Sequence, residues 1–336
     1  MDIDPPLKET YNSLLHKSSP PLRGEDKSTT TTAAAAATLI EECELPLIDL
    51  SLLGHGSSWE MRDKCMEDIR QASSEWGFFQ VVNHGIPRQL LDRMQDLQVK
   101  VFQQPFNTKA THKKLNCYRW GNPKATSSNQ FSWSEAFHIP LTDVPGLMVE
   151  YHNLREIIEE YATRAAKLAT DLAEILAQDL GVKSTFFQTN CSPTTSYLRM
   201  NRYPLCPISS HQVVFGLMPH TDSDFLTIVH QDQIGGLQLR KNGAWLNVNP
   251  IPKALIINIG DLFQALSHGV YKSIEHRVIA PREVERHSLA YFYCPSYDTV
   301  IESSVKPAIY RKFSYGEYMQ QKQKDVEASG EKVGLS

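Results

Sequence analysis

The sequence lacks the features that define several classes of protein. Its six cysteines include no C-x-x-C pair, which argues against a zinc finger or a disulfide framework and favours reduced, mostly buried thiols. Its apolar runs, such as 254–257, are far shorter than the ~20 residues that cross a bilayer. Basic residues gather only in the run 109–114, and 34 Lys and Arg face 38 Asp and Glu. We therefore expect neither a membrane segment nor a nucleic-acid surface.

The first residues also lack the cationic start and apolar middle of a secretory signal, because Asp2, Asp4 and two prolines stand there. The expected location is the cytoplasm, with the nucleus also possible. What the sequence does have is an ordinary composition. Its 336 residues, 41% of them hydrophobic, are enough for one large domain or two modest ones and exclude fibrous and wholly disordered classes.

The sequence predicts four segments. Residues 1–43 are expected to be a flexible leader, since the Ser, Thr and Ala run at 28–38 offers too little apolar area to offset its ordering entropy. Residues 44–190 form a helix-rich N-terminal region, 191–300 a β-rich core and 301–336 a helical tail. A long helix is expected over 147–180. Its apolar spacing also fits a heptad, so a coiled coil is the alternative to a helix that buttresses a sheet.

Beyond residue 191 the sequence breaks into short β-rich segments separated by Gly, Pro and Asn. Such strands, spaced by about ten residues, predict a sandwich or barrel such as a jelly roll. The fold class is therefore α+β, with a helix-rich N-terminal half covering a C-terminal β-barrel. The expected strands are 195–200, 225–229, 237–239, 245–248, 254–259, 273–279 and 286–293.

Two His-x-Asp pairs could each present an imidazole and a carboxylate to one ion, because residues i and i+2 of an extended segment share a face. His220 and Asp222 precede the apolar segment 225–229, at the mouth of a strand. His230 and Asp232 follow that segment and lead into a glycine turn, where solvated polar side chains are the simpler interpretation. We therefore choose His220 and Asp222 as metal ligands.

The third ligand must come from elsewhere, and His276 is the best placed because it lies inside the expected strand 273–279. A core histidine with no metal is the alternative for this residue. Two imidazoles and one carboxylate on one octahedral face suit Fe(II) and leave three positions open. A structural zinc site would instead fill four positions with protein ligands.

A carboxylate receptor is expected downstream of these ligands. Arg286 and Ser288 share one face of a strand, and a guanidinium with a hydroxyl beside it forms a forked clamp that lysine would not reproduce. Tyr203 can add a phenolic hydrogen bond, although a tyrosine before a proline can equally be a plain turn residue. A metal with open positions beside such a clamp favours a dicarboxylate that chelates at one end, and 2-oxoglutarate has that shape.

Six motifs, in order, resemble those of the plant 2-oxoglutarate- and iron-dependent dioxygenases, and the segment 76–85 is similar to the N-terminal region of the same family. The resemblance covers about residues 44–333. The motifs are Asn201-x-Tyr203-Pro-x-Cys206-Pro, His220-Thr-Asp222-x-x-x-Leu226-Thr, Gly235-Gly-Leu-Gln238, Asn258-x-Gly260-Asp261, His276-Arg-Val and Arg286-x-Ser288.

This resemblance implies a double-stranded β-helix, or jelly-roll, core. It also implies O2 as a second co-substrate and ascorbate as a supporting reductant. The implied ligands of Fe(II) are His220, Asp222 and His276, and those of 2-oxoglutarate are Arg286 and Ser288 with Tyr203 and Asn201.

Within that family, the stretches 118–127 and 132–140 resemble the gibberellin 2-beta-dioxygenases that act on twenty-carbon gibberellins. This resemblance implies a small-molecule gibberellin partner and inactivation of the hormone by hydroxylation at carbon 2; it leaves the oligomeric state open. The alternatives are an oxidase of the same family with another substrate, such as a flavonoid or a gibberellin precursor, and a non-catalytic small-molecule-binding barrel.

The substrate would need an apolar pocket with a cation at one end. Arg119 is the candidate partner for its carboxylate, with Tyr118, Trp133 and Phe137 as candidate walls. A surface salt bridge is the alternative role for Arg119.

Overall fold

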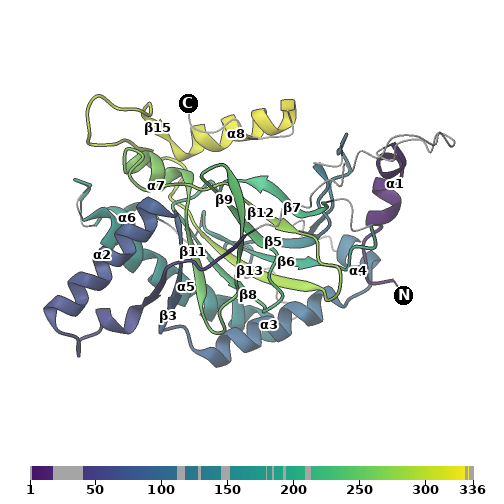
Figure 1. Cartoon of the computed structure of the whole chain (residues 1–336), viewed down its shortest axis with the longest axis horizontal. Helices are drawn as coiled ribbons and strands as arrows, with labels where there is room; N and C mark the ends of the chain where they lie inside the picture. Colours follow the sequence, from purple (N-terminus) through teal and green to yellow (C-terminus); the bar gives the residue numbers. More distant parts are fainter. Residues whose placement is uncertain are drawn as a thin grey trace, which may run out of the picture.

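The computed structural model describes residues 2–17, 41–111, 118–127, 130–144, 152–178, 180–183, 185–191, 194–208, 213–329 and 332. Two β-sheets form its centre, with helices around them (Figure 1). In spatial order, the strands of the larger sheet are β2 (Leu47–Asp49), β3 (Phe78–Val82), β11 (Leu255–Ile259), β8 (Leu226–Gln231), β13 (Arg286–Tyr293), β6 (Tyr197–Tyr203), β5 (Glu135–Pro140) and β4 (Tyr118–Trp120).

The smaller sheet and the helices complete the described structure. The smaller sheet runs β1 (Glu42–Cys43), β10 (Ala244–Val248), β9 (Leu237–Lys241), β12 (His276–Ile279) and β7 (Phe215–His220), and β14 (Val300–Ile301) pairs separately with β15 (Phe313–Ser314). The helices are α1 (Leu7–Lys17), α2 (Trp59–Glu75), α3 (Arg88–Phe102), α4 (Phe106–Thr111), α5 (His152–Ala177), α6 (Phe186–Asn190), α7 (Asp261–Leu266) and α8 (Tyr315–Ser329), with a 3-10 turn η1 (Leu50–Leu53).

Alternation along the strands separates the two faces of the larger sheet. On β11, Leu255 and Ile257 join the core that contains α2, α3 and α5, whereas Ile256 packs with Leu239 and Val278 of the smaller sheet. Successive side chains of a strand point to opposite faces. Strands β3, β6, β8 and β11 therefore have an inner face that packs against the smaller sheet, and β11 has its outer face toward the helices.

The expected fold class is confirmed, and so is the position of each expected strand. The sequence patterns did not reveal β4, β5 and β7, nor the two-residue strands β1, β14 and β15. On β7, Gly216 and Pro219 interrupt the β-branched and aromatic pattern by which strands are found. The N-terminal region is also more than a helical cover, because it supplies β2 and β3 at one edge of the larger sheet and β4 and β5 at the other.

Helix α5 lies within the range 147–180 expected from the sequence, and residues 147–151 and 179 of that range are outside the described part. Its buried stripe, which includes Tyr161, Leu168 and Leu172, belongs to the core on the outer face of the larger sheet. It contacts α2, α3, β8 and β13 of the same chain, so the helix buttresses a sheet and the coiled-coil alternative is not needed. Among the described residues, neither α5 nor any other helix is long and apolar enough to cross a membrane.

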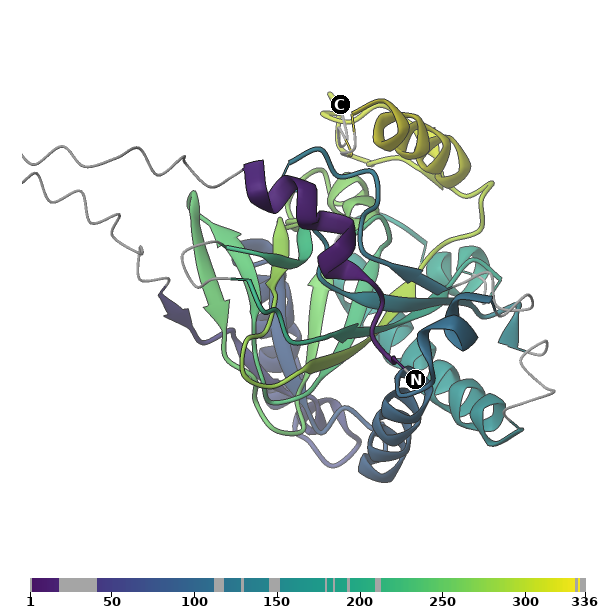
Figure 2. The same cartoon turned by 90° about the vertical axis from the view of Figure 1, so that its right-hand side faces the viewer.

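The start of the chain differs from the expected flexible leader 1–43 in two places. Residues 42–43 form β1, which pairs with β10, and over residues 2–17 α1 packs on the body of the protein (purple in Figure 2). Leu7 and Tyr11 are buried, and Tyr11 Oη accepts hydrogen bonds from the backbone N–H groups of Asn122 and Ser132. Amphipathic spacing in 7–14 offered this signal, but the low-complexity run that follows obscured it. That run, at 28–38, lies outside the described residues.

Candidate active site

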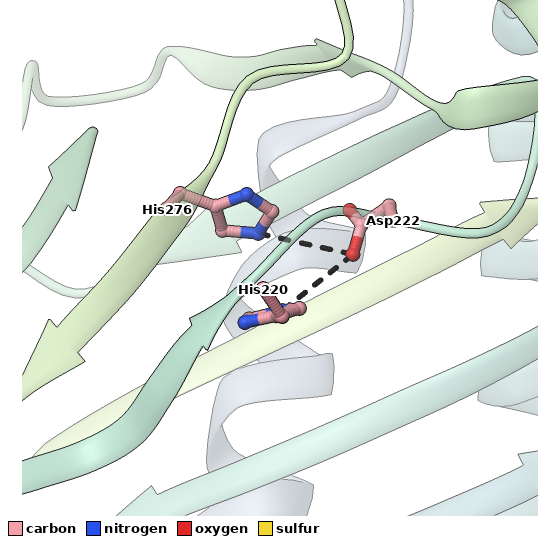
Figure 3. Close-up of side chains that lie close together, drawn as sticks. All are labelled: His220, Asp222 and His276. Carbon is pink, nitrogen blue, oxygen red and sulfur yellow. Dashed lines mark ion pairs between the residues drawn. The ribbon is translucent and has the colours of Figure 1, made fainter. Parts of the chain in front are cut away.

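The candidate metal centre forms where β7 and β12 meet. His220 ends β7, His276 begins β12, and the two residues are paired across the sheet. Asp222 lies two residues beyond the end of β7, and its Oδ1 is 3.6 Å from His220 Nε2 and 3.8 Å from His276 Nε2 (Figure 3). One ligand atom from each of the three residues lies within 4.8 Å of the others.

Backbone carbonyls orient both imidazoles. His220 Nδ1 lies 2.8 Å from the Met218 carbonyl oxygen, and His276 Nδ1 lies 3.0 Å from that of Ile274. A carbonyl can only accept, so each Nδ1 carries a proton and each Nε2 is the nitrogen placed to bind a metal. Burial, and then the charge of His276, lowers the pKa of His220 to about 3, which keeps that ring neutral at physiological pH.

The carboxylate of Asp222 is also fixed in place. Thr227 Oγ1 donates to its Oδ2 at 2.6 Å, and Asn258 Nδ2 donates to the same oxygen, which leaves Oδ1 facing the imidazoles. Burial favours the protonated form of Asp222, but His276, His220 and these hydrogen bonds outweigh it and lower the pKa to about 2. Burial, followed by the charge of Asp222, raises the pKa of nearby Asp224 well above its usual range.

This donor set fits a divalent iron. Two imidazoles and one carboxylate converge here, and their N and O donors on one face match the ligands of non-haem Fe(II) centres. Each ligand is also oriented by a hydrogen bond through an atom that does not face the metal site, as is usual for metal ligands in proteins. The choice of His220, Asp222 and His276 as the metal-binding set is confirmed.

His230 and Asp232, the pair not chosen as metal ligands, lie outside the metal centre. His230 pairs with Leu289 on the outer face of the larger sheet, and burial lowers the pKa of its imidazole. Asp232 accepts hydrogen bonds from the backbone N–H groups of Ile234 and His287. Neither residue joins the metal-binding set among the described residues. The two His-x-Asp pairs have the same spacing in the sequence, but their strands direct them to different parts of the fold.

Arg286 lies buried on the inner face of β13. It is paired with Tyr203 of β6, and its guanidinium carbon lies 4.9 Å from the centre of the Tyr203 ring. Its NH2 donates to Gln231 Oε1 at 2.7 Å, and its NH1 is 3.4 Å from Ser288 Oγ. Asn201, opposite Ser288, completes the set through a contact from its Nδ2 to Ser288 Oγ at 3.4 Å.

This pocket has unused hydrogen-bonding capacity. Arg286 Nε and Gln231 Nε2 are buried without a hydrogen-bond partner. No carboxylate of the described chain forms an ion pair with Arg286, although its side chain is only 2% exposed. A buried guanidinium of this kind is costly unless an anion pairs with it, so the pocket fits the free carboxylate of a metal-chelating dicarboxylate.

Sequence reasoning assigned no role to several residues that shape this site. Thr227 and Asn258 lie within motifs that were noticed, but their contact with Asp222 depends on the pairing of β8 with β11. Gln98 of α3 donates to the backbone carbonyls of Asn201 and Ser288, and no sequence signal marked it.

Gly216 faces the Tyr203 ring. A Cβ there would lie 2.5 Å from Tyr203 Cδ1, so this position needs the small residue.

The four candidate substrate residues divide between different environments. Arg119 lies on the inner face of β4, while Tyr118 and Phe137, paired with each other, lie in the outer core. Trp133 is buried in a cluster with Leu7 and Tyr11 of α1, and its indole N–H donates to the Leu205 carbonyl. The structure therefore does not bring the four together, and we drop Tyr118 and Phe137 from the proposed substrate wall because strand parity points them at the helices.

The fold and the site together define a non-haem, Fe(II)- and 2-oxoglutarate-dependent oxygenase. Residues 194–295 match the model of the 2OG-Fe(II) oxygenase superfamily, and residues 45–156 match the model described as non-haem dioxygenase in morphine synthesis N-terminal. The chain belongs to the 2OG-Fe(II) oxygenase superfamily. Its metal is Fe(II), and its co-substrate is 2-oxoglutarate.

Curated relatives match along the whole chain. Gibberellin 2-beta-dioxygenase 8 of Arabidopsis thaliana is 52% identical over 335 residues, which are 99% of this chain and 98% of that protein. Gibberellin 2-beta-dioxygenase 7 of the same plant is 44% identical over 100% of this chain and 99% of its own length. Gibberellin 2-beta-dioxygenase 6 of Oryza sativa subsp. japonica is 42% identical, over 99% and 95%.

Solved structures share the fold. A crystal structure of JOX2 with 2OG, Fe and JA superposes with a TM-score of 0.71 at 33% identity, over 84% of this chain and 86% of that one. A dioxygenase for auxin oxidation from rice gives a TM-score of 0.70 at 29% identity, over 86% and 97%.

Proposed function

We propose that this enzyme hydroxylates gibberellins of the twenty-carbon class at carbon 2 and thereby inactivates the hormone. The observation that carries the proposal is the 52% identity, along nearly the full length of both chains, to a gibberellin 2-beta-dioxygenase. Three other relatives with the same activity in their names match at 42–45% identity. Relatives named for other activities match at 32–35% identity and cover 82% of the chain.

The chain's own residues bind and orient the reactants. Arg286, Ser288 and Tyr203 bind the free carboxylate of 2-oxoglutarate, and Asn201 holds the Ser288 hydroxyl in place. His220, Asp222 and His276 occupy one face of the metal and leave the other face for the reactants. When bound, Fe(II) supplies the oxidative decarboxylation of 2-oxoglutarate by O2 to succinate and CO2, coupled to hydroxylation of a substrate C–H bond.

Exclusion of water follows from burial. Asp222, His276, Arg286 and Ser288 are each less than a tenth exposed, between the two sheets. A dry site strengthens the pairing of Arg286 with its carboxylate, because charges interact more strongly where the dielectric is low.

The test is incubation of the purified enzyme, Fe(II), 2-oxoglutarate and ascorbate with twenty-carbon and nineteen-carbon gibberellins, followed by mass spectrometry. We expect a product with one added oxygen at carbon 2 from the twenty-carbon substrates. Hydroxylation of a flavonoid, or of a gibberellin at another carbon, would overturn the substrate assignment while leaving the oxygenase class intact. An anaerobic titration of the enzyme with Fe(II) and 2-oxoglutarate that gave no charge-transfer absorption band would contradict the co-substrate binding.

A further inference from the structure

Two arginines and a histidine share the inner face of three neighbouring strands. Arg119 of β4 is paired with Ala136 of β5, and His138, two residues further along β5, is paired with Arg199 of β6. Residues two apart on a strand share a face, so Arg119, His138 and Arg199 lie on the same face of β4, β5 and β6, where Arg119 is exposed and Arg199 is half-buried. The neighbouring Ala136 takes little space beside them.

Lys322 approaches the same region from α8, which lies across one end of the barrel (Figure 1). Its helix face is set by Tyr318, one turn earlier, because residues four apart on a helix lie on one face. Tyr318 is buried, and its hydroxyl donates to Asp261 and contacts Ser223, the neighbour of the metal ligand Asp222. Lys322 is therefore on the face of α8 that is directed at the metal-binding loop.

The charges that act on His138 indicate that the three cations lie close to this one side chain. Burial lowers the pKa of its imidazole to about 4, followed by the charges of Arg199, Arg119 and Lys322 in that order. One acidic group, Asp143, acts in the opposite direction and more weakly than these cations. The positive charges on β4, β6 and α8 therefore converge around one side chain.

These cations have no carboxylate partner in the described part of the chain. Arg199 Nε donates to Asn201 Oδ1, and Arg119 NH1 donates to the Tyr118 carbonyl, both neutral acceptors. Arg202, the next arginine along β6, is by contrast paired with Asp4, Glu135 and Glu285. The charges of Asp222, Asp261 and Asp224 act on Lys322, but no carboxylate of the described residues pairs with the two arginines. Gathering like charges without ion-pair partners is unfavourable, so the arrangement favours an anionic ligand.

We propose that Arg119, Arg199 and Lys322 form the receptor for the carboxylates of the substrate and select a gibberellin with two free carboxylates. This inference rests on the proposed function. Twenty-carbon gibberellins carry two free carboxylates, whereas nineteen-carbon gibberellins have one of the two closed into a neutral lactone. Cations from both the sheet and α8 match the first charge pattern. The second substrate would leave one cation without its carboxylate partner, which lowers the binding energy.

The test measures KM with the Fe(II)- and 2-oxoglutarate-loaded enzyme for three substrates: a twenty-carbon diacid, its monomethyl ester and a nineteen-carbon lactone. The variants are Arg119→Met, Arg199→Met and Lys322→Met, and the control is Lys167→Met, at an exposed pair with Asp171 on α5. We expect each of the three variants to raise KM for the diacid about 10- to 100-fold, because a charged hydrogen bond is lost, and the control to leave it unchanged.

The ester and the lactone reveal which cation binds which carboxylate. A variant whose effect disappears with one monoester has lost the partner of the esterified group. Arg199→Lys should recover part of the diacid affinity, and the charge-transfer band and the KM for 2-oxoglutarate should not change in Arg119→Met.

The proposed receptor would be contradicted if a variant raised KM equally for the diacid, the ester and the lactone. It would also be contradicted if KM were unchanged in all three variants. Failure of the wild-type enzyme to hydroxylate any gibberellin would instead overturn the proposed function, so the two failures are distinguishable.

Discussion

Asn258 of β11 donates a hydrogen bond to Oδ2 of Asp222, 36 residues earlier in the chain, and so directs the other carboxylate oxygen at the two imidazoles. This contact links the centre of the larger sheet to the loop after β7. The geometry of the metal centre therefore depends on the closure of the barrel as well as on the His-x-Asp spacing.

Removal of this amide should weaken metal binding without unfolding the enzyme. For Asn258→Ala we expect a loss of about 10- to 100-fold in Fe(II) affinity, the range seen when a partner that orients a metal ligand is removed. An anaerobic Fe(II) titration followed by absorption measures it. His230→Ala, on the outer face of the same sheet, is the control and should bind Fe(II) normally. Equal weakening in both variants would show that Asn258 has no specific role.

The 2-oxoglutarate clamp predicts a separation between the two organic reactants. Arg286→Lys keeps the charge but loses the fork that contacts Gln231 and Ser288. We expect KM for 2-oxoglutarate to rise about 10- to 100-fold, with KM for the gibberellin unchanged. Steady-state assays that vary each reactant separately provide the measurement. A rise in the KM for the gibberellin alone would indicate that Arg286 binds the gibberellin and not 2-oxoglutarate.

Contact with the Tyr203 ring makes Gly216 intolerant of even a methyl group. Gly216→Ala would place Cβ 2.5 Å from Tyr203 Cδ1, so we expect a loss of about 1–3 kcal/mol in the free energy of unfolding. Urea denaturation measures this loss. In a Tyr203→Ala background the same change should cost little, since the ring is absent. Gly56→Ala is the control because a Cβ there meets no atom within 4 Å. Additive losses in the double variant would exclude the ring as the cause.

A buried ionic cluster ties the first residues of the chain to the larger sheet. Glu135 lies 2.6 Å from Lys109 Nζ and 2.6 Å from Arg202 NH1, and the side chains of Glu135 and Lys109 are fully buried. Arg202 also pairs with Asp4 at 2.7 Å, and Lys109 donates to the Ile3 carbonyl. Loss of the central carboxylate would leave Lys109 buried without an ion-pair partner among the described residues, while Arg202 would keep Asp4 and Glu285.

We therefore expect Glu135→Gln to lower the free energy of unfolding by about 3–5 kcal/mol. Asp4→Asn removes a half-exposed partner and should cost about 1 kcal/mol or less, and Lys64→Ala, at an exposed pair with Asp68, should cost still less. Denaturant unfolding of the three variants tests this order. A Glu135→Gln enzyme as stable as Lys64→Ala would show that the cluster contributes nothing to stability.

The amino-acid sequence by itself determined the chemistry of the site. His220 and Asp222 lie two residues apart, and so do Arg286 and Ser288, so an extended backbone alone presents each pair on one face. The residue types then indicate iron and a dicarboxylate before any contact is known. The expected strands were found for the same reason, because β-branched and aromatic segments bounded by Gly, Pro and Asn reflect local preferences.

Only the tertiary structure decided the rest, because the remaining relationships depend on strand register and on contacts between distant segments. The pairing of β7 with β12 brings His276 to His220, and parity along β4 separates Arg119 from Tyr118, adjacent residues with opposite surroundings. The same holds for Asn258 and Lys322, whose neighbours at the site come from other elements. A shift of one residue in register would exchange the faces, and no local pattern in the sequence records that choice.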